Sequence, residues 1–346
     1  MKKIKVGIIG LGRIGRFVYL PLLSKNKQVE IVALCDINTN VLYKTGEQFR
    51  IHKCYTNIED FLNTPIDVVI CAVPFWQNYE VSKKVLKAKK HLLVEKPMAL
   101  NFKNAQELVN IAEKNKLIYM VGYMKLYTPA VQQVKNIVAS MLREERSNII
   151  YAESQCFLGR WYPQRFNAKF SIYSQNNKPR YTKEKVRLQI PNFIKLEEKD
   201  YYLNFVRRYC HEINLLRFFF EKEPRIKSVI KNDNVLVSVL DFDNIIVSFI
   251  CGEINSKNWL EWFKVYLKDG WIQLRLPMPL NRYDRGEIEI YRNDEISYPK
   301  IYKKEWAFEL QLQHFLECIK KNVEPISSGK KSMMDIKLIE DIFREI

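Results

Sequence analysis

Short apolar runs alternate with helix-length amphipathic segments over the first third of the chain. The apolar runs, each expected to form a strand, cover residues 4–9, 29–35, 67–73, 91–95 and 118–122. The segments between them, at about 14–24, 39–49, 77–88 and 101–115, carry apolar residues at helical spacing, and Asn101 is a candidate N-cap of the last one. This alternation indicates βαβ units and a doubly wound parallel sheet.

The pattern changes after a helical segment at about 128–142. Apolar runs at 148–157, 235–240, 245–251, 263–267 and 288–291 have no helices between them, which predicts a large, mainly antiparallel sheet. One strong helix interrupts this region at about 202–220, and two more close the chain near 305–321 and 331–344. We therefore expect an α/β Rossmann-type domain over residues 1–125 and an α+β domain over 126–346, with the closing helices able to pack back on the first domain.

Composition and charge narrow the class of protein. Of 346 residues, 47% are hydrophobic and 27% charged, which suits a globular chain with two cores. The net charge of +17 comes with no nucleic-acid motif, so we interpret it as a solvated lysine-rich surface and expect no nucleic-acid partner. The longest apolar runs are too short for a membrane span, and the N-terminus resembles no signal peptide, so we expect a cytoplasmic protein without a membrane partner.

The seven cysteines are scattered singly along the chain. They form no CxxC pair, and no histidine stands at a spacing that would complete a zinc site. We expect reduced thiols, mostly in the cores, and no metal site.

A glycine-rich motif, G-x-G-x-x-G, follows the first apolar run at Gly10, Gly12 and Gly15. Gly10 permits a tight turn, Gly12 lets the backbone approach a pyrophosphate, and Gly15 permits close packing of helix on strand. Asp36 ends the second apolar run about 20 residues later, where a carboxylate would accept hydrogen bonds from ribose hydroxyls. Because Asp36 would repel a 2′-phosphate and Ile37 supplies no compensating cation, NAD is favoured over NADP as cofactor.

Glu95-Lys96-Pro97 ends the run at 91–95 and, with the glycine motif, is similar to the glucose-fructose oxidoreductase and inositol dehydrogenase (Gfo/Idh/MocA) family. The resemblance implies an oxidoreductase of sugars or cyclitols with Lys96 beside the reacting oxygen, where an ammonium stabilises developing negative charge. Expected cofactor contacts, from the motif and the resemblance together, are Gly10, Leu11, Gly12, Arg13, Ile14, Gly15, Asp36, Ile37, Ala72, Val73, Pro74, Asn78, Glu95, Lys96 and Tyr123.

The same resemblance implies a second catalytic element on the helix at 202–220, with the pattern D-x-x-x-H-x-x-D. His211 matches its histidine, which with an ordinary pKa of about 6.5 can take or supply a hydroxyl proton. Arg207 and Asn214 replace the two aspartates, and Asn204 lies one turn before Arg207. A cation at position 207 is expected to lower the pKa of His211 and favour its neutral form. A buried structural histidine is the alternative interpretation of His211.

Two further positions depart from the family pattern. Asn78 replaces a frequent histidine, and Leu126 stands where many members carry an arginine. For Arg207 and Arg208, a salt bridge or simple exposure competes with recognition of an anionic substrate.

A basic, aromatic segment at 157–200 contains Arg160 and Trp161. We name Arg160, Trp161, Asn204, Arg207 and Asn214 as candidate substrate contacts, suited to an anionic sugar, although a solvated basic lid would have the same composition. The leading hypothesis is an NAD-dependent dehydrogenase or ketoreductase of a sugar, nucleotide sugar, sugar acid or cyclitol. The alternative is a catalytically silent regulator of the same fold that binds a dinucleotide or sugar.

The second domain is expected to bind substrate and to mediate oligomerisation. One face of its antiparallel sheet carries aromatic residues that helices can leave uncovered, with Trp259, Trp262, Phe263 and Tyr266 as the candidates. We expect a homodimer or homotetramer formed by packing of this face.

Overall fold

A computed structural model describes residues 3–143, 148–159, 186–302 and 305–346. The chain groups into two compact units, and each unit is assembled from separated stretches of sequence. The first unit comprises Met1–Gly122, Pro163–Arg207 and Leu312–Lys337, and the second comprises Tyr123–Tyr162, Arg208–Gln311 and Leu338–Ile346. The division into continuous domains 1–125 and 126–346 stays a prediction.

The first unit is built on a six-stranded sheet with the order β3-β2-β1-β4-β5-β6. Its strands are β1 (Ile4–Ile9), β2 (Val29–Cys35), β3 (Lys53–Tyr55), β4 (Val68–Cys71), β5 (His91–Val94) and β6 (Tyr119–Val121). Every pairing is parallel, which confirms the predicted Rossmann-type sheet. The chain leaves β1 for β2 on one side and later returns to β4 on the other, so the strand order reverses beside β1. In open parallel sheets, ligands bind at the carboxyl ends of strands at such a reversal.

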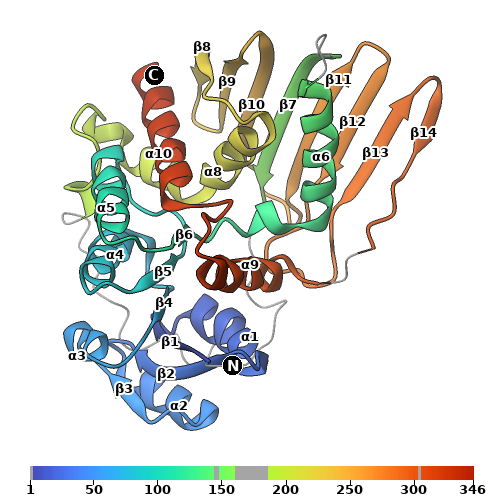
Figure 1. Ribbon diagram of the computed structural model, residues 1–346. Helices are drawn as coiled ribbons and strands as arrows, with labels where there is room; N and C mark the ends of the chain where they lie inside the picture. The colour runs from blue at the N-terminus through green and yellow to red at the C-terminus, as the bar shows by residue number, and fades with distance from the viewer. Residues whose placement is uncertain (1–2, 144–147, 160–185, 303–304) are drawn as a thin grey trace. The chain divides into compact units, whose positions relative to one another are not determined.

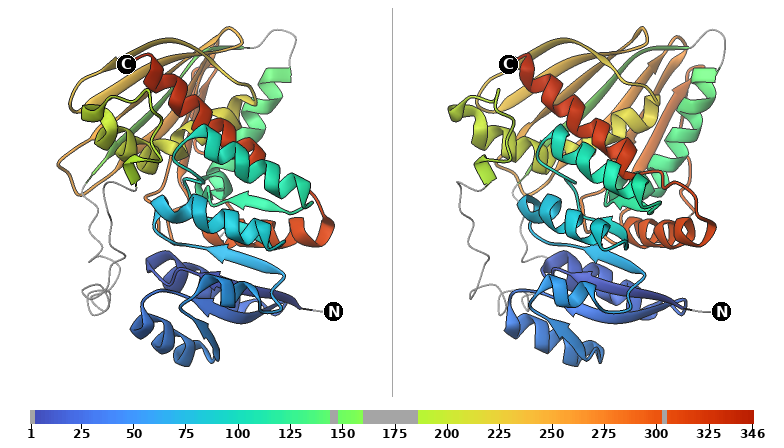
Figure 2. Two further views of the ribbon diagram at one scale, coloured as in Figure 1. Left: turned by 90° about the vertical axis from the view of Figure 1, so that its left-hand side faces the viewer. Right: turned by 60° about the vertical axis from the view of Figure 1, so that its left-hand side comes forward.

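Helices connect these strands, and asparagine caps begin three of them. The helices are α1 (Leu20–Lys25), preceded by the π-helical turn η1 (Gly15–Tyr19), α2 (Thr39–Phe49), α3 (Ile58–Leu62), α4 (Asn78–Lys87) and α5 (Phe102–Lys114). The side chains of Asn38, Asn57 and Asn101 accept hydrogen bonds from the first-turn amides of α2, α3 and α5. Helices α4 and α5 lie side by side (Figure 2). The Tyr79 hydroxyl of α4 donates to Glu107 of α5.

The end of the chain completes the edge of this sheet. The Val121 amide donates to the carbonyl of Ser327, and the Ser327 hydroxyl returns a hydrogen bond to the Val121 carbonyl. Ser327 lies between α9 (Ala307–Lys321) and α10 (Gly329–Arg344). Residues near position 330 therefore satisfy backbone groups of β6, the edge strand of the first unit, that would otherwise lack a partner.

The second unit is built on an eight-stranded sheet with the order β14-β13-β12-β11-β7-β10-β9-β8 (Figure 1). Its strands are β7 (Ile149–Leu158), β8 (Arg225–Lys231), β9 (Val235–Phe242), β10 (Ile245–Glu253), β11 (Leu260–Leu267), β12 (Gly270–Arg275), β13 (Glu287–Arg292) and β14 (Glu295–Ser297). The prediction of a mainly antiparallel sheet is confirmed, and β7 with β10 is its parallel pair.

Helices α6 (Pro129–Arg143) and α8 (Lys199–Phe220) contribute to the core on one face of this sheet. Phe219 of α8 stacks on Phe263 of β11 with ring centroids 4.3 Å apart, and Phe263 is 2% exposed. This contact corrects the expectation that Phe263 lies on the uncovered face. Because side chains alternate along a strand, Trp262 and Tyr266 share the other face, whereas Trp259 precedes β11 and donates its indole N–H to the Gly159 carbonyl.

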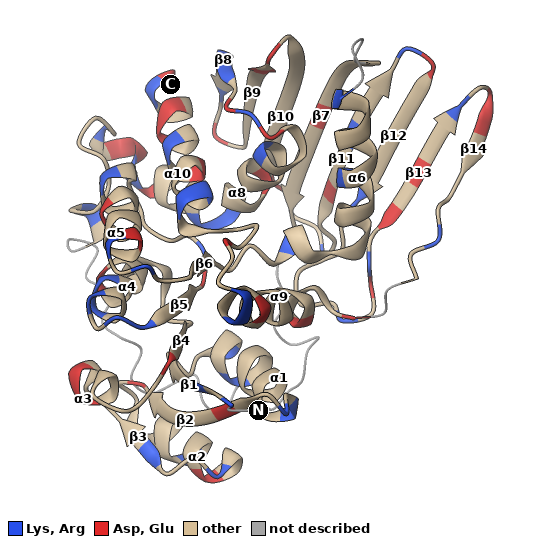
Figure 3. Cartoon of the chain, in the orientation of Figure 1, with Lys and Arg blue, Asp and Glu red and all other residues tan. Residues whose placement is uncertain are grey.

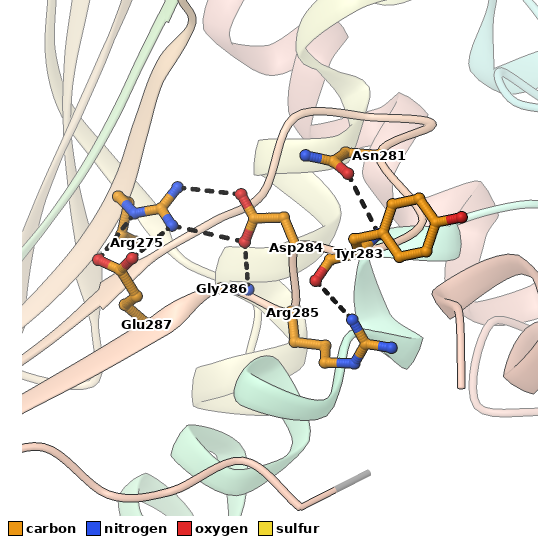
Figure 4. Close-up of polar contacts among 7 residues, drawn as sticks. All are labelled: Arg275, Asn281, Tyr283, Asp284, Arg285, Gly286 and Glu287. Atoms are coloured by element: carbon orange, nitrogen blue, oxygen red, sulfur yellow. Dashed lines mark hydrogen bonds and ion pairs between the residues drawn. The ribbon is translucent and has the colours of Figure 1, made fainter. Parts of the chain in front are cut away.

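The loop between β12 and β13 is held by a network of charged groups (Figure 4). Arg275 donates to both oxygens of Asp284 at 3.4 Å and to Glu287 at 2.9 and 3.0 Å. Asp284 in turn accepts the Gly286 amide at 2.9 Å, at a position where φ is +80°. The carboxylate thus fixes a turn that favours glycine.

Charges of both signs are dispersed over the elements of each unit (Figure 3). The seven cysteines are all free thiols, and only Cys54 is not buried. Among the described residues, no helix combines the length and apolar character needed to cross a membrane.

Candidate active site

The glycine motif forms the turn between β1 and η1. A side chain at Gly10, where φ is +89°, would meet the backbone of Ala72 at 2.6 Å, and one at Gly15 would meet the Gly10 carbonyl oxygen at 2.1 Å. A side chain at Gly12 would meet no atom within 4 Å. Internal packing therefore explains Gly10 and Gly15 but not Gly12, whose open surface at a helix N-terminus fits the pyrophosphate of a dinucleotide.

Asp36 lies beside this turn. Its Oδ2 accepts the Leu11 amide at 2.6 Å and its Oδ1 accepts the Asn38 amide at 2.8 Å. The carboxylate is half-buried and thus held in a defined orientation next to the glycine turn, while Ile37 is 59% exposed. The binding of ribose hydroxyls by Asp36 stays a prediction.

Residues after β4 and β5 form the adjacent part of the sheet edge. Ala72 follows β4 and donates its amide to the Ile9 carbonyl at 2.8 Å, so the Ala72–Pro74 segment lies next to the glycine turn. Asn78, which is fully buried, donates from Nδ2 to the carbonyls of Glu95 at 2.7 Å and Pro97 at 2.8 Å. Asn78 was predicted to contact the cofactor, and these bonds give it a further role, since they hold the backbone on both sides of Lys96.

Glu95 is anchored by a contact that the sequence pattern did not reveal. The Tyr19 hydroxyl, at the end of η1, donates to Glu95 Oε1 at 2.6 Å. Burial raises the pKa of the Glu95 carboxyl above its ordinary value, while the Tyr19 hydrogen bond and the nearby Lys96 ammonium oppose that rise. The hydrogen bond ties the segment after the glycine turn to the Glu95-Lys96-Pro97 motif.

Lys96 extends its side chain to the middle of α8. Its Nζ donates to the main-chain carbonyl of Arg207 at 2.8 Å. The Arg207 guanidinium lies over the ring of Phe75, 5.7 Å from its centroid, and the side chain is exposed. Lys96 and Arg207 thus place two cations at the same sheet edge of the first unit.

His211 lies one helical turn after Arg207 on α8, and it belongs to the second unit. Its imidazole is 7% exposed and packs edge-to-face with Tyr123, with ring centroids 5.6 Å apart. Asn204 is exposed, whereas Asn214 is 5% exposed. The residues expected on one helix face therefore pass from exposed to buried along α8.

Three other candidate residues are placed as follows. Arg160 and Trp161, the predicted substrate contacts, lie outside the described residues. Arg208 pairs with Glu253 of β10 at 2.5 Å, which favours the salt-bridge interpretation for this arginine.

A compact group of possible metal ligands occurs in the second unit, formed by Cys156, Glu212 and Glu261. Lys125 lies among them, with Nζ 2.6 Å from Glu212 Oε1 and 2.5 Å from Glu261 Oε1. The ammonium therefore takes the position between the carboxylates that a bound cation would need. Sequence analysis did not predict this cluster.

Comparison with known proteins finds a family model that matches the N-terminal part of the chain. Residues 4–123 match the Gfo/Idh/MocA family, described as an oxidoreductase family with an NAD-binding Rossmann fold. An inositol 2-dehydrogenase/D-chiro-inositol 3-dehydrogenase of Lactiplantibacillus plantarum is 31% identical over 137 residues. That match covers 39% of each protein, so it spans about two fifths of the relative's length.

Solved structures share the fold along nearly the whole chain. An aldose-aldose oxidoreductase from Caulobacter crescentus has a TM-score of 0.78 at 18% identity, covering 99% of this chain and 97% of that one. The 3-ketoreductase KijD10 from Actinomadura kijaniata, solved with TDP-benzene and NADP, has a TM-score of 0.73 at 15% identity over 98% and 96% of the two chains. Residues 4–123, with their glycine turn, Asp36 and Glu95-Lys96-Pro97, match the Gfo/Idh/MocA family of oxidoreductases.

Proposed function

We propose that this protein is an NAD-dependent oxidoreductase that interconverts a carbinol and a ketone on a sugar, nucleotide sugar, sugar acid or cyclitol. The observation that carries the proposal is the position of Lys96, at the carboxyl end of β5 in the sheet that also holds the glycine turn. The nicotinamide would supply or accept the hydride when bound. The protein would supply the binding surface, the charge and the proton.

Lys96 is the proposed group that stabilises negative charge on the reacting oxygen. An ammonium has three N–H donors, and the Arg207 carbonyl accepts one of them at 2.8 Å, which leaves donors for a substrate oxygen. The bonds from Asn78 to the Glu95 and Pro97 carbonyls restrain the backbone at this position. Such preorganised donors stabilise a developing alkoxide without reorganisation.

His211 is the proposed proton donor and acceptor. An imidazole can take a hydroxyl proton during oxidation or supply it during reduction. Support comes from the family resemblance at this helix, in which His211 matches the histidine of the pattern. We regard Lys96 and His211 as the catalytic pair.

The preference for NAD rests on Asp36. Its carboxylate is fixed by the Leu11 and Asn38 amides beside the glycine turn, where it would accept hydrogen bonds from ribose hydroxyls and repel a 2′-phosphate. The 3-ketoreductase KijD10 was solved with NADP, whereas the matched family model is described as NAD-binding. We propose NAD for this chain because of its own acidic residue.

The substrate is proposed to be a carbohydrate or cyclitol, of either neutral or anionic character. The names of an inositol dehydrogenase and an aldose-aldose oxidoreductase support this class. The exposed Arg207 favours an anionic member of it, because a guanidinium binds carboxylates and phosphates through paired donors. We also propose a homodimer or homotetramer and a cytoplasmic location, with no nucleic-acid or membrane partner.

One observation favours the alternative, a regulator that binds the dinucleotide without catalysis. Arg and Asn stand at positions 207 and 214, where the family resemblance implies aspartates that would orient the histidine. A silent site would keep NAD(H) binding and lose turnover.

The deciding experiment combines binding with turnover. NAD⁺, NADH, NADP⁺ and NADPH are titrated by calorimetry, and a panel of inositols, aldoses, sugar acids and nucleotide sugars is then screened for cofactor oxidation or reduction. Lys96→Ala is compared with Lys84→Ala, a change at a surface lysine that pairs with Glu59. Turnover that Lys96→Ala abolishes and Lys84→Ala preserves supports the enzyme. NAD(H) binding without turnover of any member of the panel overturns the proposal in favour of the regulator.

A further inference from the structure

The second unit buries a lysine between two glutamates. Lys125 lies in the 3-10 turn η3 (Met124–Tyr127), Glu212 on α8 and Glu261 on β11. The Lys125 Nζ is 2.6 Å from Glu212 Oε1 and 2.5 Å from Glu261 Oε1, and the three side chains are 4%, 1% and 3% exposed. We call these three residues the buried triad. It connects a turn, a helix and a strand.

The glutamate of the triad that lies on β11, Glu261, is buried in the core. Glu261 lies directly opposite Cys156 in the antiparallel pairing of β11 with β7, and both side chains point into the core. Burial raises the pKa of the Glu261 carboxyl to about 8, with Glu212 adding to the rise and Lys125 opposing it. The cluster therefore contains a carboxyl group, that of Glu261, whose ionisation is opposed by burial.

Stability alone does not account for such a cluster. Removing three ionisable groups from water is costly, and apolar residues of similar volume often give equal or greater stability in the same place. A charged triad, however, is directional, because its hydrogen bonds are lost when one element rotates or slides. This indicates a role in orienting the elements that it connects.

Helix α8, one of the elements that the triad connects, carries His211. Glu212 follows His211 directly on α8, and Tyr123, two residues before Lys125, packs its ring edge-to-face with the His211 imidazole at 5.6 Å. One short segment, Tyr123–Lys125, thus contacts two consecutive residues of the helix. Rotation of α8 at this turn would break the Lys125–Glu212 pair and move the imidazole away from Tyr123.

We propose that Lys125, Glu212 and Glu261 are positioning residues that hold the α8 turn carrying His211 in one orientation. The inference rests on the proposed function, because the three residues act on the reaction only if His211 is the group that exchanges the proton. They do not contact the reacting atoms themselves.

The first test observes His211 without requiring turnover. The chain contains only four histidines, so the protein labelled with ¹³C at histidine gives few resonances, and His211→Gln identifies that of His211. Lys125→Met is compared with Lys135→Met. Lys135 is a matched control, because it is also a buried lysine that donates to α8, but at the Phe219 carbonyl near the C-terminal end of the helix.

We expect Lys125→Met to shift or broaden the His211 resonance while the other three histidine resonances stay in place. Lys135→Met should leave the His211 resonance unchanged. An unchanged His211 resonance in folded Lys125→Met overturns the inference, and an equal response to both lysine variants does the same.

A second variant guards against failure of Lys125→Met to fold. The triple change Lys125→Met, Glu212→Leu, Glu261→Leu removes all three charges together, and we expect its melting temperature to equal or exceed that of the wild type. Turnover should fall on the order of 10²-fold, as for other displaced catalytic groups, with the dissociation constant of NADH unchanged. Wild-type turnover together with an unchanged His211 resonance in this variant overturns the inference.

The two proposals fail in different ways. If the His211 resonance responds as expected but no substrate is turned over by the wild type, the proposed function fails and the positioning of His211 stands. If the wild type is active and the triad variants leave both the His211 resonance and turnover unchanged, the enzyme stands and the positioning role is wrong.

Discussion

The ammonium of Lys96 lies 2.8 Å from the main-chain oxygen of Arg207, 111 positions later in the chain. Because the acceptor is a backbone atom, this contact survives any change of the Arg207 side chain. The side chain itself lies over Phe75 and is exposed. The charge at position 207 can therefore be altered without removing the hydrogen bond that orients Lys96.

Arg207→Asp uses this separation and restores the residue that the family resemblance implies. If the guanidinium binds an anionic substrate, the Michaelis constant should rise by about tenfold or more, about 1.4 kcal/mol, with a smaller change in turnover. Steady-state kinetics on an anionic and a neutral sugar check this. An equal effect on both sugars would contradict recognition of the anion by Arg207.

Lys96→Ala and His211→Gln test the proposed catalytic pair. Each should lower turnover, on the order of 10² to 10⁴-fold for the proton-transfer group His211 and by as much or more for Lys96, with the dissociation constant of NADH nearly unchanged. Single-turnover kinetics and calorimetry measure the two quantities separately. Loss of NADH binding in step with turnover would indicate a structural role instead.

Gly12→Ala and Gly15→Ala separate ligand binding from packing within one turn. A methyl group at position 15 would meet the Gly10 carbonyl oxygen at 2.1 Å, so this variant should lose about 2 kcal/mol or more of stability. The methyl group at position 12 meets no protein atom within 4 Å, so stability should stay within about 0.5 kcal/mol of the wild type. Gly12→Ala should instead weaken NADH binding. Thermal unfolding with and without NADH measures both effects, and unweakened binding would contradict the assignment of this turn.

Asp36→Ala and Asp36→Asn test the choice of cofactor. The asparagine keeps one oxygen that can accept the Leu11 amide and loses the second acceptor, so it removes the charge with less disturbance of the turn than alanine does. Both variants should bind NADP(H) better relative to NAD(H) than the wild type does, by about tenfold or more. Calorimetry with the four cofactor forms checks the ratio. A wild type that binds NADP(H) more tightly than NAD(H) would overturn the preference for NAD.

The raised pKa of the Glu261 carboxyl should be visible in the dependence of the free energy of unfolding on pH. Its pKa is raised from 4.5 to about 8 in the folded protein, so between these values the folded state holds a proton that the unfolded chain has released. The stability associated with this proton is complete below about pH 4.5 and is lost as the pH rises through about 8. Glu261→Gln should flatten this part of the curve. Urea unfolding at a series of pH values measures it, and identical slopes in the two proteins would contradict the raised pKa.

Assembly is tested on the face of the eight-stranded sheet that carries Trp262 and Tyr266. Trp262→Glu places a charge on this face without touching Phe263, which is packed against Phe219 on the opposite face. We expect a dimer or tetramer in the wild type and a smaller particle in the variant, measured by light scattering at micromolar concentration. A monomeric wild type would contradict the proposed assembly.

Local patterns of apolar residues were sufficient to predict the alternating strands and helices of the first unit. Residues 4–9 and 29–35 are strands, and helix α2 begins and ends at the predicted residues, because buried parallel strands are continuous apolar runs and amphipathic helices carry a period near 3.6. The short strand β3 and the helix α3 were not predicted, since three to five residues are too few to show a period. Strands β8, β12 and β14 were also missed. The exposed polar residues of β8 and β14 hide any strand pattern.

The candidate site residues of the first unit could likewise be predicted from the sequence. The glycine turn, Asp36 and Lys96 follow strands directly, and parallel strands bring their carboxyl ends to one edge, so order in sequence predicts proximity in space. The contact between Tyr19 and Glu95 could not be predicted from the order of the strands, because the sequence around Tyr19 is that of an ordinary core residue in an apolar helix.

The sequence by itself therefore determined the parallel sheet, the glycine turn with Asp36 at its side, and the presence of Lys96 and His211 as candidate groups. Only the tertiary structure decided which charged residues are buried and what they contact. Glu212 lies 87 positions after Lys125 in the sequence, and Glu261 lies 136 positions after it. In the sequence, each of the three residues alone resembles a surface residue. Their burial depends on the pairing of β11 with β7 and the packing of α8, which are long-range interactions that no local period records.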